Sequence, residues 1–368
     1  MLARNRVKGS VSQYAEFDLK FYQNICDKMV KVICSPRRYF FRLLLLLIFT
    51  ACTSNQKATP TFEREEIQFS SSGTALLSIP SLNGNKIAIR IKKPDGDGPF
   101  PVLIGVAGGD GMYAFRSELP TSLLEKGIMT VDFAPQGRGE SEGDDNHHGF
   151  VHQDDLKAVV DFVNELSFVQ KDNIGILSYS YGVVLATGAL ARYPDMPVAF
   201  LIDWEGPSCP GKDFQRGLEN DEAWVYETIR FLNNGRELAP EELSHFLLHG
   251  GSIFDEEYWE ERDASRFAAD ISCPYLRVQF DQDHVQGSYK NHMIAIINAA
   301  TMNSGHWTRC NDNPANIIYS EEGLSQYQFH RYSGNDMPGF FSSNSQSVDT
   351  ILLGYAEEMF FSRPYEDQ

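Results

Sequence analysis

The chain has 368 residues, of which 42% are hydrophobic and 12% aromatic, so it can bury a large core and does not have the composition of a disordered protein. Its formal net charge is −18; the first 51 residues hold nine basic and three acidic side chains, so the rest carries −24. Such a surface repels nucleic-acid phosphates and anionic lipid headgroups, which argues against a nucleic-acid partner.

The N-terminal region predicts export. Arginines between positions 37 and 42 precede the apolar run Leu43–Ile48, and small residues follow it. The run is far shorter than the ~20 residues of a membrane-spanning helix, and this order is typical of a secretory signal. Phe49-Thr-Ala-Cys52 resembles a bacterial lipobox, although Phe49 stands where leucine is usual. We therefore expect residues 1–51 to be a signal region and Cys52 to carry a lipid anchor in the bacterial cell envelope.

The start of the chain indicates an over-extended beginning. Residues 1–28 fit no targeting pattern, whereas Met29 would begin a signal of ordinary length. Small polar residues follow Cys52, so we place a flexible tether at 52–73 and one domain at 74–368.

From residue 74 onward, short apolar runs alternate with segments of helical periodicity. The expected strands are Thr74–Pro80, Lys86–Lys92, Pro101–Val106, Ile128–Phe133, Ile174–Leu177, Val198–Ile202 and Tyr275–Phe280, and the expected helices are Phe115–Glu125, Gln153–Phe168 and Ser347–Phe361. Strands that alternate with helices of this length predict an α/β fold with a mostly parallel central sheet and helices on both faces.

The alternation of strands and helices stops between Gly206 and Ile271, where the sequence becomes helical, acidic and aromatic. The expected helices there are Trp224–Phe231, Pro240–Leu248 and Glu256–Phe267. We predict a helical cap inserted at about 206–271, whose aromatic side chains either line an acyl pocket or form the cap's own core. His245 and His249 are four residues apart without a third ligand, and we place them on the cap surface.

A serine lies where the strand Ile174–Leu177 passes into a helix of small residues. The local sequence Ser178-Tyr-Ser180-Tyr-Gly182 resembles the nucleophile elbow G-x-S-x-G, with Ser178 in place of the first glycine. So sharp a turn lifts the Ser180 Oγ above the sheet, where the first N–H groups of the helix also point. Ser180 is the predicted nucleophile.

A serine hydroxyl needs a base to take its proton, and the base needs a carboxylate to orient it. In chains with this elbow the partners follow in the order serine, acid, histidine. Asp283 lies beyond the strand Tyr275–Phe280 and is the expected acid, with Asp281 in reserve. His306 follows Gly305 in a later loop and is the expected base.

The developing oxyanion needs N–H donors. One expected donor is the backbone N–H of Tyr181, directly after the nucleophile. The second should come from the glycine-rich loop after the strand Pro101–Val106, where glycines let the backbone approach a substrate. We assign it to the N–H of Gly109.

Taken together, these motifs resemble the α/β-hydrolase superfamily over most of residues 86–361. The stretch Asp132-Phe-Ala-Pro-Gln-Gly-Arg-Gly-Glu-Ser-Glu-Gly143 is similar to a loop of esterases, dienelactone-hydrolase-like proteins and prolyl-oligopeptidase-like peptidases. The resemblance implies the roles of nucleophile, acid and base for Ser180, Asp283 and His306. The chain departs from the usual pattern at Ala107, at Phe280 and in the long segment 307–346 after the histidine.

A group of histidines and aspartates suggests a metal site at first sight. His147, His148 and His152 lie among aspartates, but their spacing fits no recognisable zinc site, so no metal is predicted. Asp154 and Asp155 are expected to support a helix N-terminus.

A second acidic position follows the strand Val198–Ile202. Asp203-Trp-Glu205 lies where some hydrolases carry their acid, but we rank it behind Asp283, because Trp204 and Pro207 suit a cap hinge and a pocket wall.

Three cysteines remain after Cys52, namely Cys209, Cys273 and Cys310, which allow one disulfide at most.

The predicted function is hydrolysis of carboxylic esters through an acyl-enzyme intermediate, with no metal or organic cofactor required. The expected partners are a small-molecule ester or peptide-like substrate and a membrane reached through the lipid anchor. The alternatives are a prolyl-type serine peptidase, an acyltransferase or thioesterase, and a non-catalytic binding lipoprotein. The sequence does not define the oligomeric state.

Overall fold

The computed structural model describes residues 67–115, 120–233, 235–279 and 345–361, together with positions 283, 286, 292, 295–296, 299–300, 317–318 and 327–328. All of them belong to one compact unit, Ile67–Gln368. The predicted signal region, the lipobox cysteine Cys52, most of the tether, the reserve acid Asp281 and the base His306 lie outside the described residues.

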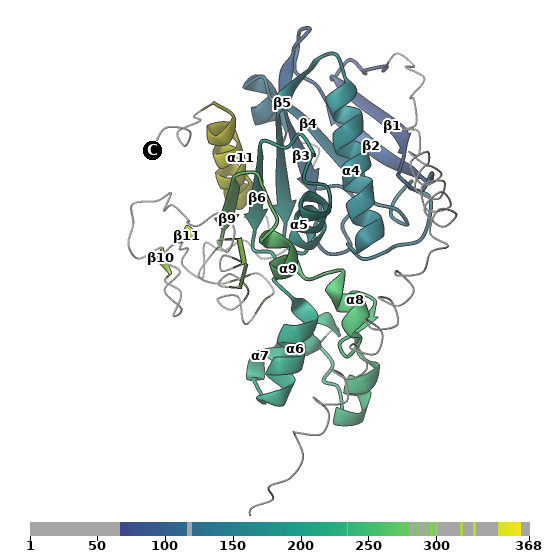
Figure 1. Ribbon diagram of the computed structural model, residues 1–368, viewed down its shortest axis with the longest axis vertical. Coiled ribbons are helices and arrows are strands. Elements are labelled where there is room, and N and C mark those ends of the chain that lie inside the picture. Colours follow the sequence, from purple (N-terminus) through teal and green to yellow (C-terminus); the bar gives the residue numbers. More distant parts are fainter. Residues whose placement is uncertain are drawn as a thin grey trace, which may run out of the picture. The chain divides into compact units, whose positions relative to one another are not determined.

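A seven-stranded sheet forms the centre of this unit (Figure 1). The strand order is β1-β2-β4-β3-β5-β6-β9, with antiparallel pairing of β1 with β2 and of β2 with β4, and parallel pairing elsewhere. Because β4 and most of β3 and β6 are buried on both faces, their sequences are nearly continuous apolar runs. The strands are β1 Thr74–Pro80, β2 Lys86–Lys92, β3 Phe100–Val106, β4 Met129–Ala134, β5 Val169–Tyr179, β6 Phe200–Trp204 and β9 Tyr275–Val278.

Helices cover both faces of the sheet, as predicted (Figure 1). On one face lie α4 (Phe150–Glu165) and α5 (Gly182–Arg192), which pack against each other. On the other lie the short α3 (Thr121–Glu125) and α11 (Ser345–Phe361), in one apolar cluster with side chains of β3, β5 and β6. The Phe200 and Phe360 rings, 4.8 Å apart, join β6 to α11 in this cluster.

Between β6 and β9 the chain leaves the sheet and forms a helical cap with its own apolar core. Trp259 is buried in this core, where its ring contacts Gly211 so closely that a Cβ there would overlap it. The cluster continues to Val183 and Val184 of α5. The cap consists of α6 Pro210–Glu219, α7 Ala223–Leu232, the 3₁₀ helix η2 Pro240–His245, the hairpin of β7 Leu247–Leu248 and β8 Gly251–Ser252, α8 Glu256–Glu260 and α9 Ala264–Ala268.

The first expected helix, Phe115–Glu125, is wrong at its start. Phe115 is not helical, because its N–H donates to Asp132 Oδ2 at 2.9 Å and its carbonyl accepts from Arg90. These side-chain partners hold the backbone outside a helix, and α3 begins only at Thr121.

The cap also differs from the prediction in detail. The expected helix Glu256–Phe267 is two helices, because the Asp263 side chain accepts from the Arg266 N–H and caps a new helix, α9. The expected helix Pro240–Leu248 is the shorter η2 followed by β7, and α6 was not anticipated.

In the described part of the chain, no helix combines the length and apolarity that crossing a bilayer demands. Cys209 and Cys273 are both free thiols, and Cys310 lies outside the described residues.

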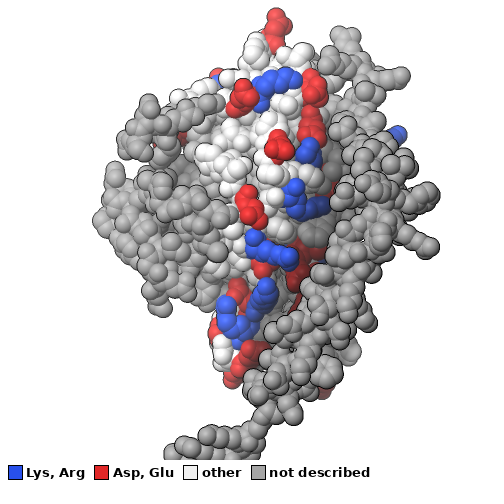
Figure 2. All heavy atoms as spheres, in the orientation of Figure 1, with Lys and Arg blue, Asp and Glu red and all other residues white. Residues whose placement is uncertain are grey.

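Charged side chains of both signs alternate along the face shown in Figure 2. Ion pairs on the protein join Lys157 to Asp161 and Arg192 to Asp154. In the second pair, both side chains are partly exposed, and 2.8 Å separates Arg192 Nη2 from Asp154 Oδ1. A single ion pair of this kind contributes little to stability, but such pairs place basic side chains among the acidic ones on the surface.

Buried polar side chains, rather than apolar ones, hold the loop between β4 and α4. Asp155 of α4 accepts from Ser81 Oγ at 2.5 Å and from the Gln136 N–H and side chain at 2.8 and 2.6 Å. The expectation that Asp155 supports a helix N-terminus is therefore wrong, and so is that for Asp154, which pairs with Arg192 and Tyr193.

His152 anchors the same loop as a neutral ring. Its Nδ1 accepts from the His148 N–H at 3.1 Å, and its Nε2 lies 3.1 Å from the Asn146 nitrogen, whose N–H points to it, and 2.9 Å from the Gln136 carbonyl oxygen. Burial, followed by the nearby Arg138 guanidinium, lowers the pKa of His152 to about 4. Protonation at Nδ1 would replace an acceptor with a donor and break the contact with His148.

We expect this ring to make the fold less stable in acid. The unfolded imidazole titrates near ~6.5, whereas the folded ring resists protonation down to about 4, so the unfolded state binds more protons between these values. The free energy of unfolding should fall by about 2 kcal/mol from this group between pH 8 and pH 5. Urea titrations of the wild type and of His152→Gln at pH 8, 6 and 5 measure it.

In that comparison His152→Gln should be less stable at pH 8 but should lose less stability on acidification. His245→Gln, at an exposed cap histidine, is the control and should keep the slope of the wild type. Equal slopes for the wild type and His152→Gln would refute the assignment.

Candidate active site

Ser180 occupies a strained turn between β5 and α5. Its φ of +50° lies in the left-handed region that residues with a side chain rarely adopt. Its N–H donates to the Trp204 carbonyl at the end of β6 at 2.7 Å, and its own carbonyl accepts from Val183 at 3.1 Å. The backbone on both sides therefore holds Ser180 at the strand-to-helix turn that the sequence predicted.

Two glycines allow the neighbouring loop to approach this turn. A Cβ on Gly108 would lie 2.9 Å from the Ser180 Cβ and would overlap the Tyr179 carbonyl. A Cβ on Gly182 would lie 2.7 Å from the Ala107 carbonyl oxygen. Ser178 occupies the position at which a glycine is usual. Its side chain is fully buried and its hydroxyl donates to the Ile202 carbonyl at 3.3 Å, so the fold accommodates a serine at this position.

The loop 107–111 is held from behind by Arg138. The Gly109 carbonyl accepts from Arg138 Nη1 at 2.6 Å and lies 2.8 Å from His148 Nε2, while the Gly111 carbonyl lies 3.1 Å from Arg138 Nη1. The other side of the guanidinium binds the Asp145 carboxylate at 3.0 and 3.2 Å. Within the loop, the Gly111 N–H donates to the Gly108 carbonyl at 2.9 Å.

The two N–H groups that the sequence singles out, those of Tyr181 and Gly109, have no acceptor among the residues that the structure describes. Tyr181 lies directly before α5, and Gly109 has a φ of +50° in the loop beside Ser180. Their role remains a prediction.

The ring of Tyr181 joins the elbow to the cap. It is buried between the His148 ring, 5.2 Å away and edge-on, and the His249 ring, stacked at 4.0 Å. The placement of His249 on the cap surface is therefore wrong: it lies in the turn between β7 and β8 and faces Tyr181. Burial lowers the pKa of His148 well below its usual value and that of His249 to about 4, so both rings are neutral at pH 7.

Arg262 forms a second link from the cap to the sheet domain. Its guanidinium is buried, donates to the Asn146 and His147 carbonyls, and lies 3.5 Å from the centre of the Tyr258 ring. Sequence reasoning missed this role, although an arginine in an aromatic, acidic segment could have indicated it.

Asp283 lies at the edge of the sheet where β6 and β9 end. Its Oδ1 accepts from the Gln286 N–H at 2.7 Å, and its Oδ2 accepts from Gln279 Nε2 at 2.9 Å. Gln279 also donates to Glu205 Oε1 at 3.3 Å. Glu205 directly follows Trp204, whose carbonyl binds Ser180, so Ser180, Glu205 and Asp283 share one sheet edge.

Glu205, which we ranked behind Asp283 on the sequence, is buried and has a left-handed backbone. It is fully buried, has a φ of +51°, and its N–H donates to the Val278 carbonyl of β9 at 3.1 Å.

The aromatic side chains of the cap fall into two groups. Trp259 is buried in the core of the cap, while Phe254 and Tyr226 are 56% and 42% exposed.

One cluster could present ligands to a cation. Oxygen and nitrogen atoms of Asp110, Asp145 and His147 lie within 4.8 Å of one another. Asp145 is already bound by the Arg138 guanidinium, which neutralises it and would repel a cation, so the cluster is an ion-pair network.

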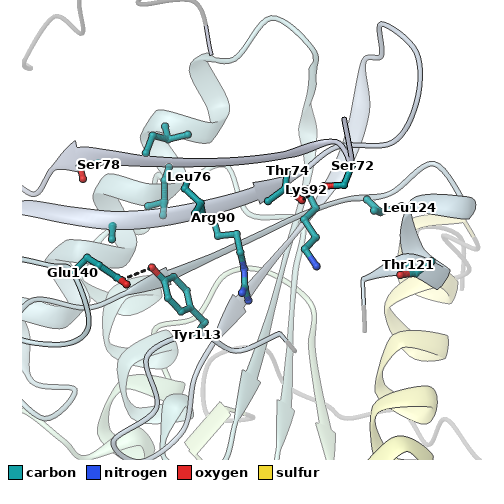
Figure 3. Close-up of a pocket in the computed structure, with 13 residues that line it drawn as sticks. Ser72, Thr74, Leu76, Ser78, Arg90, Lys92, Tyr113, Thr121, Leu124 and Glu140 are labelled. Atoms are coloured by element: carbon teal, nitrogen blue, oxygen red, sulfur yellow. Dashed lines mark hydrogen bonds between the residues drawn. The ribbon is translucent and has the colours of Figure 1, made fainter. Parts of the chain in front are cut away.

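A pocket of about 690 Å³ lies elsewhere, over β1 and β2 (Figure 3). Figure 3 shows Tyr113 donating to Glu140, a contact of 3.0 Å, with Arg90 and Lys92 nearby. None of its lining residues is among the predicted catalytic side chains.

Comparisons with known proteins bear on the fold. No model of a protein family matches the sequence. The chain is 25% identical over 248 residues to the 2,6-dihydropseudooxynicotine hydrolase of Paenarthrobacter nicotinovorans; the match spans 66% of this chain and only 62% of that protein.

Solved structures are similar at lower identity. Acetyl xylan esterase 1 from Thermoanaerobacterium has a TM-score of 0.53 and 15% identity, over 80% of this chain and 87% of that one. Est1E from Butyrivibrio proteoclasticus, solved with ferulic acid, has a TM-score of 0.50 and 18% identity, over 77% and 98%. A putative dipeptidyl aminopeptidase IV from Bacteroides ovatus has a TM-score of 0.52 and 15% identity, over 77% and 35%. Together with the strand order and the strained serine turn, these similarities show that the chain has the α/β-hydrolase fold.

Proposed function

We propose that the protein is a serine hydrolase that cleaves carboxylic esters through an acyl-enzyme intermediate. The observation that carries the proposal is the left-handed backbone of Ser180 on a turn from a buried strand into a helix. Such strain is kept where it presents a nucleophile above the sheet edge. The curated relative is itself a hydrolase, and one solved structure of this fold is an acetyl xylan esterase, which supports the same class of reaction.

In this proposal the Ser180 Oγ attacks the ester carbonyl while His306 takes the hydroxyl proton. The N–H groups of Tyr181 and Gly109 stabilise the oxyanion, because neither is used by another acceptor among the described residues. His306 then gives its proton to the departing alcohol, and water releases the acid by the reverse steps. Asp283 holds the tautomer of the imidazole that can accept the proton. These steps require no metal and no organic cofactor.

We expect a fluorophosphonate probe to label the wild type and to fail on Ser180→Ala, since the probe forms a covalent bond with an activated serine hydroxyl. Ser178→Ala is the matched control: it removes a buried hydroxyl two residues away and should keep the labelling. Gel fluorescence after probe treatment measures the outcome. Labelling of Ser180→Ala, or of no variant at all, would contradict the proposal.

The same proteins should separate the substrate classes. Turnover of p-nitrophenyl acetate should fall by at least about 10³-fold in Ser180→Ala, as expected when a nucleophile is removed. A prolyl p-nitroanilide should remain uncleaved by the wild type. Faster cleavage of the anilide than of the ester would replace the esterase assignment with the prolyl-type peptidase.

We also propose that the enzyme is exported and held at the bacterial cell envelope by lipid on Cys52, since a basic stretch, a short apolar run and a lipobox-like sequence precede this cysteine. Metabolic labelling with palmitate should mark the wild type and leave Cys52→Ser unmarked. Cys34→Ser, before the apolar run, should still be labelled. Labelling that survives Cys52→Ser would overturn the proposal.

A further inference from the structure

A fully buried ion pair lies beneath the acid of the proposed site. Asp203 of β6 and Arg277 of β9 face each other across the parallel pair of strands, with Arg277 Nη1 2.5 Å from Asp203 Oδ2. Tyr275 donates to the same oxygen at 2.7 Å, and neither charged side chain is exposed. Burial alone would lower the pKa of Arg277, but Asp203 raises it above the usual value, so the guanidinium stays charged.

This guanidinium determines the orientation of the Gln279 amide. Arg277 Nη2 donates to Gln279 Oε1 at 2.6 Å. A guanidinium has donors only, so the amide oxygen must face it and the NH₂ group must face the opposite way. Rotating the amide by 180° would bring NH₂ against Arg277 and oxygen against two carboxylates, which costs several contacts at once.

The NH₂ group of Gln279 lies between two carboxyl groups, one directly after β6 and the other beyond the end of β9. It donates to Asp283 at 2.9 Å and to Glu205 at 3.3 Å. Gln279 and Glu205 are both fully buried, so water does not screen the charges there as it does at the surface. Gln286 completes the arrangement, with its N–H on Asp283 and its side chain on the Glu205 carbonyl.

We propose that Gln279 is a positioning residue that fixes the Asp283 and Glu205 carboxyl groups through its NH₂ group and so sets the proton affinity of the catalytic base. The inference rests on the proposed function, in which Asp283 orients His306. A neutral amide provides donors to both carboxylates without adding charge. A glutamate of the same shape would keep the contact with Arg277 but would place an additional acidic group beside these two.

The pH dependence of ester hydrolysis tests this. The base must be neutral to act, and extra negative charge nearby favours its protonated form. In Gln279→Glu the acid limb of kcat/KM should therefore move up by about one pH unit, with roughly tenfold lower kcat/KM on that limb and recovery at higher pH. A purely structural defect would lower activity at every pH and leave the limb in place.

Gln153→Glu is the matched control. Gln153 is also a fully buried glutamine whose oxygen faces an arginine, Arg192, at 3.2 Å and whose NH₂ binds an oxygen, the Glu261 carbonyl, at 3.0 Å. It lies in α4 outside the proposed machinery, so its acid limb should match that of the wild type.

A second variant keeps the inference testable if Gln279→Glu does not fold. Glu205→Gln removes an acidic group beside Gln279 and should move the acid limb down, and the double variant with Gln279→Glu should return it toward the wild type. An acid limb of Gln279→Glu that coincides with that of Gln153→Glu, or of Glu205→Gln with that of the wild type, would overturn the inference. If the wild type is labelled at Ser180, that result refutes only the role of Gln279; absence of labelling refutes the proposed function.

Discussion

The structure depends on the backbone of Ser180, held in a left-handed conformation between β5 and α5. Strain of this kind costs on the order of 1–3 kcal/mol and persists only where the surroundings fix it. Here the Trp204 carbonyl takes the Ser180 N–H, and Gly108 and Gly182 remove the side chains that would otherwise keep the loop 107–111 away. The turn, the start of the helix and the loop are therefore one unit.

A second buried arrangement fixes the acid at the same sheet edge. Strand β9 has only four residues, yet it carries Arg277 toward Asp203 on β6, and Gln279, directly after the strand, contacts Asp283. A buried charge without a partner is strongly destabilising, so the pair between β6 and β9 is maintained with one geometry. The register of a short strand thereby determines where the acid lies relative to Ser180.

The sequence predicted what local patterns determine. Apolar runs located all seven strands of the main sheet, and the strand-to-helix turn located Ser180. It missed contacts that depend on folded neighbours: the Asp132 and Arg90 side chains that keep Phe115 out of a helix, and the stacking of His249 on Tyr181. Polar residues carry no periodicity that reveals their partners, so the contacts of Arg138 and Gln279 became visible only in three dimensions.

Tyr181 connects the cap to the proposed chemistry. Its N–H belongs to the turn beside Ser180, while its ring is packed between His148, which contacts the Gly109 carbonyl, and His249 of the cap. A shift of the cap would have to move a buried aromatic ring that follows the nucleophile directly in the chain. Since Arg262 also ties the cap to the loop before α4, buried contacts join the cap to the rest of the domain at two places, one of them beside the elbow.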